Sequence, residues 1–399
     1  MNPASKRCLV GLTLLSLVSA QVDWFGYLES EWDRLAMNAR EYNFGYLKYR
    51  LDMESRPTDR VLVAANVNFQ QYLGETTWNL LDFLPGPIWK PELQPSTLPD
   101  SLWVTEYPFT YHDTLYLDNA YLRVNFNHLD VTLGKQPVSL GTGYAWNPVD
   151  IFNYKNPVDP TYEQTGIQAL RLDVPLTDRG GLTAILTPAG GWDSATKYIQ
   201  WKSGIGSFDF TLNWSQYEGV YRWWDYVLYA GLAPTTTRYR AVGGTLVGEL
   251  FGVGVWTEVW RKTQAAFDKK EFWEAVAGAD YTFSNGWYVL NEVYRNEQGA
   301  LPEAVTLYDY LFYFNGSTHS LMQTYDFFYT FYPVGDFVNA GIFALANLDD
   351  HSALVSPQIE WNLYENGTLT LWYSTSLGKA DTEFGWQGDG WRLRLRTYF

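Results

Sequence analysis

The sequence predicts an all-β protein: a closed, antiparallel transmembrane β-barrel of about 18 strands, with 16 strands as the alternative. Three observations favour this fold. Short segments alternate apolar and polar residues, short turns alternate with long connections along the chain, and aromatic residues make up 18% of the sequence. After residue 20, no run approaches the roughly 20 apolar residues that a membrane helix needs.

The N-terminal residues have the three parts of a secretory signal peptide. Lys6 and Arg7 are positive, residues 8–18 are apolar, and Val18-Ser19-Ala20 supplies small residues for cleavage. A buried core helix is the less favoured interpretation. We therefore expect residues 1–20 to be a cleaved signal peptide and residues 21–399 to form a single outer-membrane barrel domain.

Strands are predicted from alternation with period two. In residues 208–215, for example, Phe208 and Leu212 lie on one face and Asp209 and Asn213 on the other. Residues 220–233 could form another strand, and residues 303–313 could form a helix or an extended hairpin. We expect strands to begin near Trp24, Phe44, Val61, Asp113, Leu129, Ile167, Gly181, Thr196, Ser207, Arg238, Val253, Phe272, Trp287, Ser320, Phe337, Ala353, Thr368 and Trp391.

The connections between these strands differ in length on the two sides of the predicted barrel. Short turns rich in Gly, Pro, Asn and Asp alternate with long connections, which is typical of outer-membrane barrels. This asymmetry places both termini in the periplasm and the long loops outside the cell. The connections 73–112 and 137–165 are long enough to fold into the lumen or to cap its outer mouth, and both possibilities stay open.

A soluble sandwich or propeller would also contain many alternating strands. No propeller period is visible in the sequence. Aromatic residues gather at segment ends, as in Trp287-Tyr288, where a membrane interface would favour them. The membrane barrel is therefore the preferred prediction.

The last nine residues form an alternating strand with three arginines on one face. Trp391, Leu393, Leu395, Thr397 and Phe399 share the other face. This pattern resembles the C-terminal strand of Gram-negative outer-membrane barrels, although Thr397 replaces the usual hydrophobic residue. The resemblance implies that Phe399 is an assembly signal read by the barrel assembly machinery.

Arginines on the lipid face would each cost roughly 2–4 kcal/mol at the midplane, so these arginines are predicted to face the lumen. Fixed charges in a pore set its selectivity. The predicted network acts either as a constriction that selects anionic solutes or as salt bridges that only brace the wall, and the net charge of −16 weighs against strong anion selectivity. The predicted pore-lining residues are Lys48, Arg50, Arg123, Arg171, Arg392, Arg394 and Arg396, opposed by Glu29, Glu31 and Asp173.

Residues 133–153 carry a second pattern. Gly134-Lys135-Gln136 ends a strand, a glycine-containing turn follows, and Asn147-Pro148-Val149-Asp150 comes next. With Asn119 to Leu122 upstream, the pattern resembles porin-like barrels of the alginate-export type. The resemblance implies a channel of 16 or 18 strands with inward loops. It places Lys135 and Gln136 at the wall near the extracellular end and Trp146, Asn147 and Asp150 in an inward loop. An ordinary turn network is the alternative.

No catalytic motif or metal-ligand spacing is apparent, so we expect no enzyme activity, no metal and no cofactor. The acidic charge argues against nucleic-acid binding. The expected partners are the lipid bilayer, lipopolysaccharide, the assembly machinery and small polar solutes. The predicted function is a porin that passes small polar or anionic solutes, with saccharides among the candidates. The alternative is a plugged barrel with a structural or surface-polysaccharide role.

Overall fold

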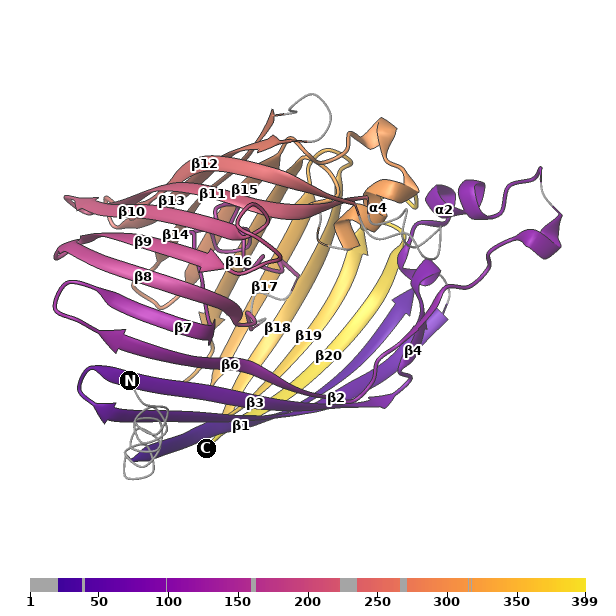
Figure 1. Cartoon of the computed structure of the whole chain (residues 1–399). Coiled ribbons are helices and arrows are strands. Elements are labelled where there is room, and N and C mark those ends of the chain that lie inside the picture. The colour runs from indigo at the N-terminus through magenta and orange to yellow at the C-terminus, as the bar shows by residue number, and fades with distance from the viewer. Residues whose placement is uncertain are drawn as a thin grey trace, which may run out of the picture.

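The chain folds into a closed barrel of 18 antiparallel strands (Figure 1). The computed structural model describes residues 21–37, 40–97, 99–158, 163–222, 235–265, 271–314, 316 and 318–399. The predicted signal peptide, residues 1–20, lies outside the described residues, as does most of the segment 220–233.

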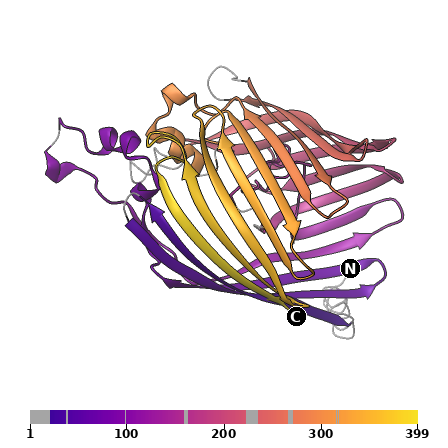
Figure 2. The same ribbon diagram turned by 180° about the vertical axis from the view of Figure 1, so that it is seen from behind.

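Each barrel strand pairs with its neighbours in chain order, and the last strand pairs with the first (Figure 2). Because all 18 strands are paired on both sides, the barrel exposes no free sheet edge. The barrel strands are β1 (Val22–Met37), β2 (Arg40–Thr58), β3 (Val61–Gly74), β6 (Thr114–Asn125), β7 (Asp130–Gln136), β8 (Ile167–Thr177), β9 (Gly180–Thr187), β10 (Thr196–Ile205), β11 (Phe208–Arg222), β12 (Thr235–Leu250), β13 (Val253–Gln264), β14 (Glu271–Thr282), β15 (Tyr288–Asn296), β16 (Thr324–Pro333), β17 (Val338–Asn347), β18 (Ser352–Tyr364), β19 (Gly367–Leu377) and β20 (Gln387–Tyr398).

The strand prediction is confirmed. Each of the 18 strands begins within four residues of its predicted start, and the alternative count of 16 is wrong. The largest offsets occur at β2 and β20, which begin earlier, at Arg40 and Gln387, and at β16, which begins later, at Thr324. Alternation signals the part of a strand that contacts lipid, whereas the extension beyond it has no such pattern.

The two ends of the barrel differ. At the turn end, short connections such as Gly206–Ser207 and Phe251–Gly252 join the strands, and Gly206 adopts φ +58°, a left-handed conformation that favours glycine. Phe399 closes the barrel at this end, because its backbone exchanges two hydrogen bonds of 3.1 Å with Gly26. At the loop end lie the long connections, which carry all the described helices.

The outer surface of the barrel is apolar and bears aromatic residues near the turn end. Leu28 and Trp32 of β1 point outward and are exposed, whereas Glu29 and Glu31, which lie between them in the sequence, are buried. This alternation is that of a wall with lipid on one side and a polar lumen on the other. Exposed aromatic residues on the outward face near the turn end include Trp24, Phe126, Phe283, Trp287 and Phe399.

The connection between β3 and β6 forms a small substructure beyond the strands at the loop end (Figure 1). It contains the hairpin β4–β5, the helix α2 and two short 3-10 helices. It therefore caps one side of the loop end. Its elements are β4 (Thr77–Asn79), η1 (Leu80–Phe83), α2 (Gly86–Leu93), η2 (Asp100–Leu102) and β5 (Pro108–Thr110).

The connection between β15 and β16 contains η3 (Pro302–Ala304) and α4 (Leu307–Phe314). A helix, not an extended hairpin, occupies this segment. Leu307, Tyr310 and Leu311 are buried against Leu84 and other residues of the β3–β6 connection. No helix among the described residues is long and apolar enough to cross a bilayer.

Loops fill part of the lumen with apolar side chains. One buried cluster joins Leu84 and Tyr310 of the outer connections to Trp146 of the β7–β8 connection and to Tyr294 and Phe327 of the wall. A second cluster packs Val138 and Val149 of the same β7–β8 connection against Tyr198, Ala241 and Trp260. The β7–β8 connection thus lies inside the barrel, whereas the region near β20, β1 and β2 carries charged groups in its place.

Candidate functional site

The closure between β20 and β1 carries a ladder of three ion pairs on the lumen face. The register places Glu29 opposite Arg396, Glu31 opposite Arg394 and Asp33 opposite Arg392. The nitrogen–oxygen distances are 2.5 Å, 2.5 Å and 2.9 Å respectively. Residues directly opposite each other on paired strands face the same side of the sheet, so alternation on both strands aligns the charges. The outward residues Leu393 and Leu395 between the arginines are exposed.

The ladder continues onto β2 through a carboxylate from a loop. Glu163, in the β7–β8 connection, lies 3.1 Å from Lys48 Nζ and 3.0 Å from Arg50, and accepts a 2.7 Å hydrogen bond from the Tyr27 hydroxyl. Burial opposes ionisation of Glu163, but Lys48, Tyr27 and Arg50 outweigh it and hold its pKa below the ordinary value. Glu163 therefore ties the β7–β8 connection, as a carboxylate, to the wall at β1 and β2.

These groups together form the seam network, and its charges nearly cancel. Arg50 also bonds Asp52 at 2.8 Å and lies 3.9 Å from Asp118. A buried cation with an adjacent carboxylate offers a passing anion little net attraction. The five cations are Lys48, Arg50, Arg392, Arg394 and Arg396, and the six carboxylates are Glu29, Glu31, Asp33, Asp52, Asp118 and Glu163.

The other predicted lumen charges lie apart from the seam network. Arg171 pairs with Asp173 two residues along β8, at 2.7 Å. Arg123 on β6 donates to the Thr132 hydroxyl at 3.3 Å and lies over the Tyr121 ring. The structure therefore brings Lys48, Arg50 and the β20 arginines together with Glu29 and Glu31, and leaves Arg123, Arg171 and Asp173 outside that network.

Residues 137–158, here called the inward segment, are held by two wall carboxylates. Glu258 of β13 accepts hydrogen bonds from the backbone N–H groups of Thr142, Gly143 and Val149. Glu258 and the second wall carboxylate, Glu292, are both fully buried. Glu292 of β15 accepts from the backbone N–H groups of Tyr144, Ala145 and Trp146, at 2.5, 2.9 and 3.0 Å, and from the Trp256 indole. We call Glu258 and Glu292 the anchor carboxylates.

The glycines of the inward segment permit this attachment. Gly141 adopts φ +85°, and a Cβ there would lie 2.5 Å from Glu258 Oε1. A Cβ at Gly143 would lie 1.9 Å from the carbonyl oxygen of Trp146. Backbone conformation at Gly141 and space at Gly143 both exclude larger residues.

The inward segment is also braced from within. Asp150 is fully buried and accepts from the N–H groups of Leu140, Phe152 and Asn153 at 2.8, 2.9 and 3.0 Å. Burial raises the pKa of Asp150 to about 7, although the three N–H groups act in the opposite direction. Asn147 donates to the Asn153 carbonyl at 2.9 Å and accepts from the Lys155 N–H. These two side chains therefore give the segment its shape.

Trp146 fixes the segment to the apolar wall, because its ring stacks on Tyr294 with centroids 4.9 Å apart. Gln136 is buried at the end of β7 and donates to the Ala169 carbonyl at 2.9 Å. Lys135 shares the outward face of β7 with the exposed Leu133, and its ammonium donates to the Leu117 carbonyl at 2.7 Å. Lys135 is therefore a wall residue that bonds the neighbouring strand.

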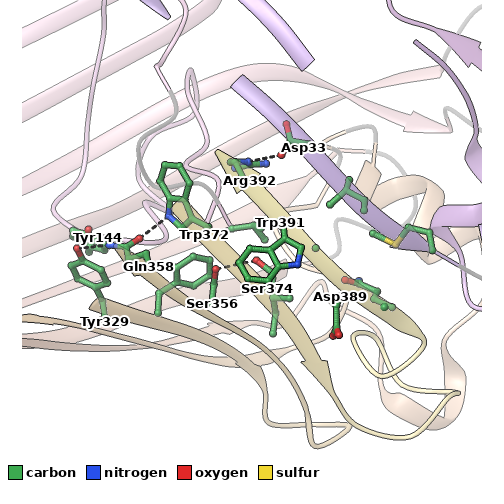
Figure 3. Close-up of a pocket in the computed structure, with 18 residues that line it drawn as sticks. Asp33, Tyr144, Tyr329, Ser356, Gln358, Trp372, Ser374, Asp389, Trp391 and Arg392 are labelled. Carbon is green, nitrogen blue, oxygen red and sulfur yellow. Dashed lines mark hydrogen bonds and ion pairs between the residues drawn. The ribbon is translucent and has the colours of Figure 1, made fainter. Parts of the chain in front are cut away.

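A cavity of about 240 Å³ separates the inward segment from the seam network (Figure 3). The wall contributes residues from β16 round to β1, and the inward segment contributes Tyr144 and Val158. Asp33, Asp389 and Arg392 are its charged lining residues, and Gln358 and Trp372 also line the wall. Small lumen-facing residues, Ser356 and Ser374 among them, leave this side of the barrel unfilled.

Among the residues that the structure describes, no group of three or more His, Cys, Asp or Glu side chains is placed to hold a metal ion.

Sequence reasoning missed several of the residues that build this site. Asp33 continues the alternation of Glu29 and Glu31 and could have been found from that pattern. Glu258 and Glu292 are single acidic residues on otherwise ordinary strands, and Glu163 lies in a loop. No local pattern marks these three, because their partners come from segments more than 100 residues away.

Comparison with solved structures identifies the fold. Residues covering 95% of this chain match 98% of OccAB4 from Acinetobacter baumannii, with a TM-score of 0.59 and 11% sequence identity. Two Pseudomonas aeruginosa proteins also match with TM-scores of 0.55: OccK5 (10% identity; 94% of this chain and 98% of that one) and OccK3 (11% identity; 97% of each). These neighbours are Gram-negative outer-membrane porins, so the chain has a porin-like fold. Neither a protein-family model nor a curated protein sequence matches the chain.

Proposed function

We propose that this protein is an outer-membrane porin through which small polar solutes cross passively. The observation that carries the proposal is the cavity between the charge-balanced seam network and the inward segment, because it leaves open space, bordered by charged and hydrogen-bonding groups, inside a closed barrel. The porin-like fold supports the same conclusion. In this proposal the protein is not an enzyme and needs no cofactor.

The proposed orientation follows the asymmetry of the two ends. The turn end, with Phe399, faces the periplasm, and the loop end faces outward, where α2 and α4 meet lipopolysaccharide and the medium. The exposed aromatic residues near the turn end would lie at a membrane interface. Residues 1–20 act as the export signal, and Phe399 is read by the barrel assembly machinery. The alginate-export type remains a proposal for the finer family.

Planar-bilayer recording tests the channel. Purified, folded protein is expected to give stepwise conductance with weak ion selectivity, because the five cations and six carboxylates of the seam network nearly cancel. Glu163→Gln removes one carboxylate and should shift the reversal potential in a KCl gradient toward anions. A matched change outside the lumen, Glu41→Gln at the exposed Arg34 pair, should leave the reversal potential unchanged.

A plugged barrel with a structural or polysaccharide-binding role is the second candidate. It is favoured by the apolar cluster in which Leu84, Tyr310 and Trp146 of three different loops meet inside the loop end. The bilayer experiment separates the two functions. Silence of a sample whose folding is verified by heat-modifiable electrophoresis would contradict the porin and favour the plug.

A further inference from the structure

The cavity between the inward segment and the seam has a mostly apolar lining that is interrupted by uncharged hydrogen-bonding groups. The Gln358 amide donates to the Tyr329 hydroxyl at 3.1 Å and its carbonyl accepts from the Trp372 indole at 2.7 Å (Figure 3). The Ser356 and Ser374 hydroxyls lie 3.0 Å apart. Such groups bond to each other in a fixed arrangement and retain capacity for a solute, because an amide N–H₂ has two protons and a hydroxyl both donates and accepts.

Asp33 adds an acceptor that no protein group in the described residues satisfies. Its Oδ1 accepts from Arg392 at 2.9 Å, but its Oδ2 is buried and has no hydrogen-bond partner. Only 1% of the Asp33 side chain is exposed. A buried oxygen without a partner costs about 1–3 kcal/mol. A solute hydroxyl that enters the cavity and donates to Oδ2 would remove that cost.

Aromatic rings supply the apolar part of the cavity. Trp372 lies along its wall, held by Gln358 and by the Arg394 guanidinium 5.1 Å from its ring. Tyr144 of the inward segment and Tyr329 of β16 stack with centroids 6.0 Å apart. The rings therefore present fixed faces rather than mobile side chains, and an apolar face of a solute could pack on them.

The cavity disfavours a charged solute of either sign. Such a solute would lose its hydration in a small, mostly apolar space, and the Asp33–Arg392 pair at the margin is already neutralised. The volume of about 240 Å³ is below the roughly 300–1,000 Å³ of a pocket for a drug-sized ligand, so the cavity suits one ring.

We propose that this cavity is a binding subsite for a neutral, polyhydroxylated ring of the hexopyranose type, with Trp372 and Gln358 as the residues that determine specificity. The proposal rests on the proposed channel function and names its substrate class. Hydroxyls of the solute bond Gln358, the serine pair and Asp33 Oδ2, while a face of C–H groups packs on an aromatic ring. A sugar therefore pauses at this point of the passage, whereas small ions pass.

Two readouts test the subsite. Saturation-transfer NMR on the detergent-solubilised protein reports binding without requiring conductance, and sugar-induced reduction of the current in a planar bilayer reports binding within the passage. The probes are D-glucose, its carboxylate analogue D-glucuronate and its amine analogue D-glucosamine, which share one ring. D-Glucose is expected to bind about tenfold more tightly than either charged analogue.

The variants are Trp372→Ala and Gln358→Leu, with Trp361→Ala as the matched control. Trp361 lies on the neighbouring strand but faces outward and is exposed. Each cavity variant should weaken glucose binding about tenfold or more, and Trp361→Ala should leave it unchanged. The two cavity variants remove different groups, so misfolding of one, detected by heat-modifiable electrophoresis, leaves the other as the test.

The possible failures are distinguishable. Conductance without glucose binding overturns the subsite and leaves the channel intact. Glucose binding without conductance overturns the passive channel and supports the subsite. Equal or tighter binding of glucuronate or glucosamine overturns the neutral substrate class, and full glucose binding by both cavity variants overturns the assignment of Trp372 and Gln358.

Discussion

Two regions of the lumen satisfy buried carboxylates in different ways. At the seam network, Glu29, Glu31 and Asp33 face arginines across one strand pairing. On the opposite side, Glu258 and Glu292 have no cation within bonding distance among the described contacts and instead accept backbone N–H groups of the inward segment. The seam therefore joins wall to wall, whereas the anchor carboxylates join wall to loop.

The two arrangements have different consequences: the seam network closes the barrel, whereas the anchor carboxylates set the shape of its passage. Arginine has long side-chain reach and fixed charge, so it can neutralise a carboxylate on the next strand. Backbone N–H groups are available only where a loop has no secondary structure of its own. A carboxylate that binds them therefore selects one loop conformation. We expect damage at the seam to lower the stability of the barrel and damage at the anchors to free the inward segment.

The largest expected effect comes from the double change Glu258→Gln and Glu292→Gln. Each amide keeps one oxygen but places an N–H₂ group against backbone donors, so the segment should lose about 5 kcal/mol of attachment. Hydrogen–deuterium exchange across residues 142–149 should accelerate strongly, and the conductance should become larger or noisy. The exposed Glu249→Gln serves as the control. Unchanged exchange in the double variant would contradict the anchoring role.

A smaller effect is expected at the seam. Glu31→Gln leaves the nine-tenths buried Arg394 without its 2.5 Å partner, which should destabilise the barrel by about 3 kcal/mol. Heat-modifiable electrophoresis over a temperature series measures the loss. Because the exposed Arg34–Glu41 pair contributes little, Glu41→Gln should lie within about 0.5 kcal/mol of the wild type. Equal losses in the two variants would show that burial does not decide the contribution.

The smallest effect is a pH response that differs between two loop carboxylates. The pKa of Glu163 lies below its ordinary value, because Lys48, Tyr27 and Arg50 outweigh burial. Burial raises the pKa of Glu383, in the β19–β20 connection, to about 8, although Tyr325 and Asn347 donate to it at 2.6 Å each.

The sign of each response follows from linkage between protonation and folding. The stability that Glu163 contributes is present above its unfolded pKa of about 4.3 and is lost as the pH falls through its lower folded value. The contribution of Glu383 is present at low pH and is lost as the pH rises through about 8. Exchange near residue 163 should therefore accelerate in acid. Exchange in residues 378–386 should accelerate as the pH rises from the unfolded pKa of about 4.3 to about 8, after correction for the intrinsic rate. Glu163→Gln should abolish the acid response, and Glu383→Gln should abolish the response in residues 378–386. If each variant instead abolished the other response, the assignment would be refuted.

Most of the fold could be predicted from the sequence because lipid and lumen impose alternation on each strand independently. Residues 208–215 and 391–399 show a strand, its two faces and its orientation without knowledge of any partner. The pairing of the β20 arginines with Glu29 and Glu31 was predictable for the same reason, since a closed barrel must pair its last strand with its first.

Loop conformations could not be obtained in this way. The resemblance of residues 133–153 to porin-like barrels indicated an inward loop, but the segment contains no signal for Glu258 or Glu292. The helix α4 lies in a segment that was compatible with a hairpin, and packing against Leu84 and the lumen wall decides its burial. The cavity depends on Tyr144 and Val158 as well as on the wall, so its position too is a property of the attached loop.

The sequence by itself determined the closed barrel, its apolar exterior and the charged seam, because each follows from local alternation and from the need to pair every strand edge. Only the tertiary structure decided where the inward segment lies, which carboxylates hold it and which space remains open. These depend on contacts between residues more than 100 positions apart, whose side chains meet only after the barrel closes.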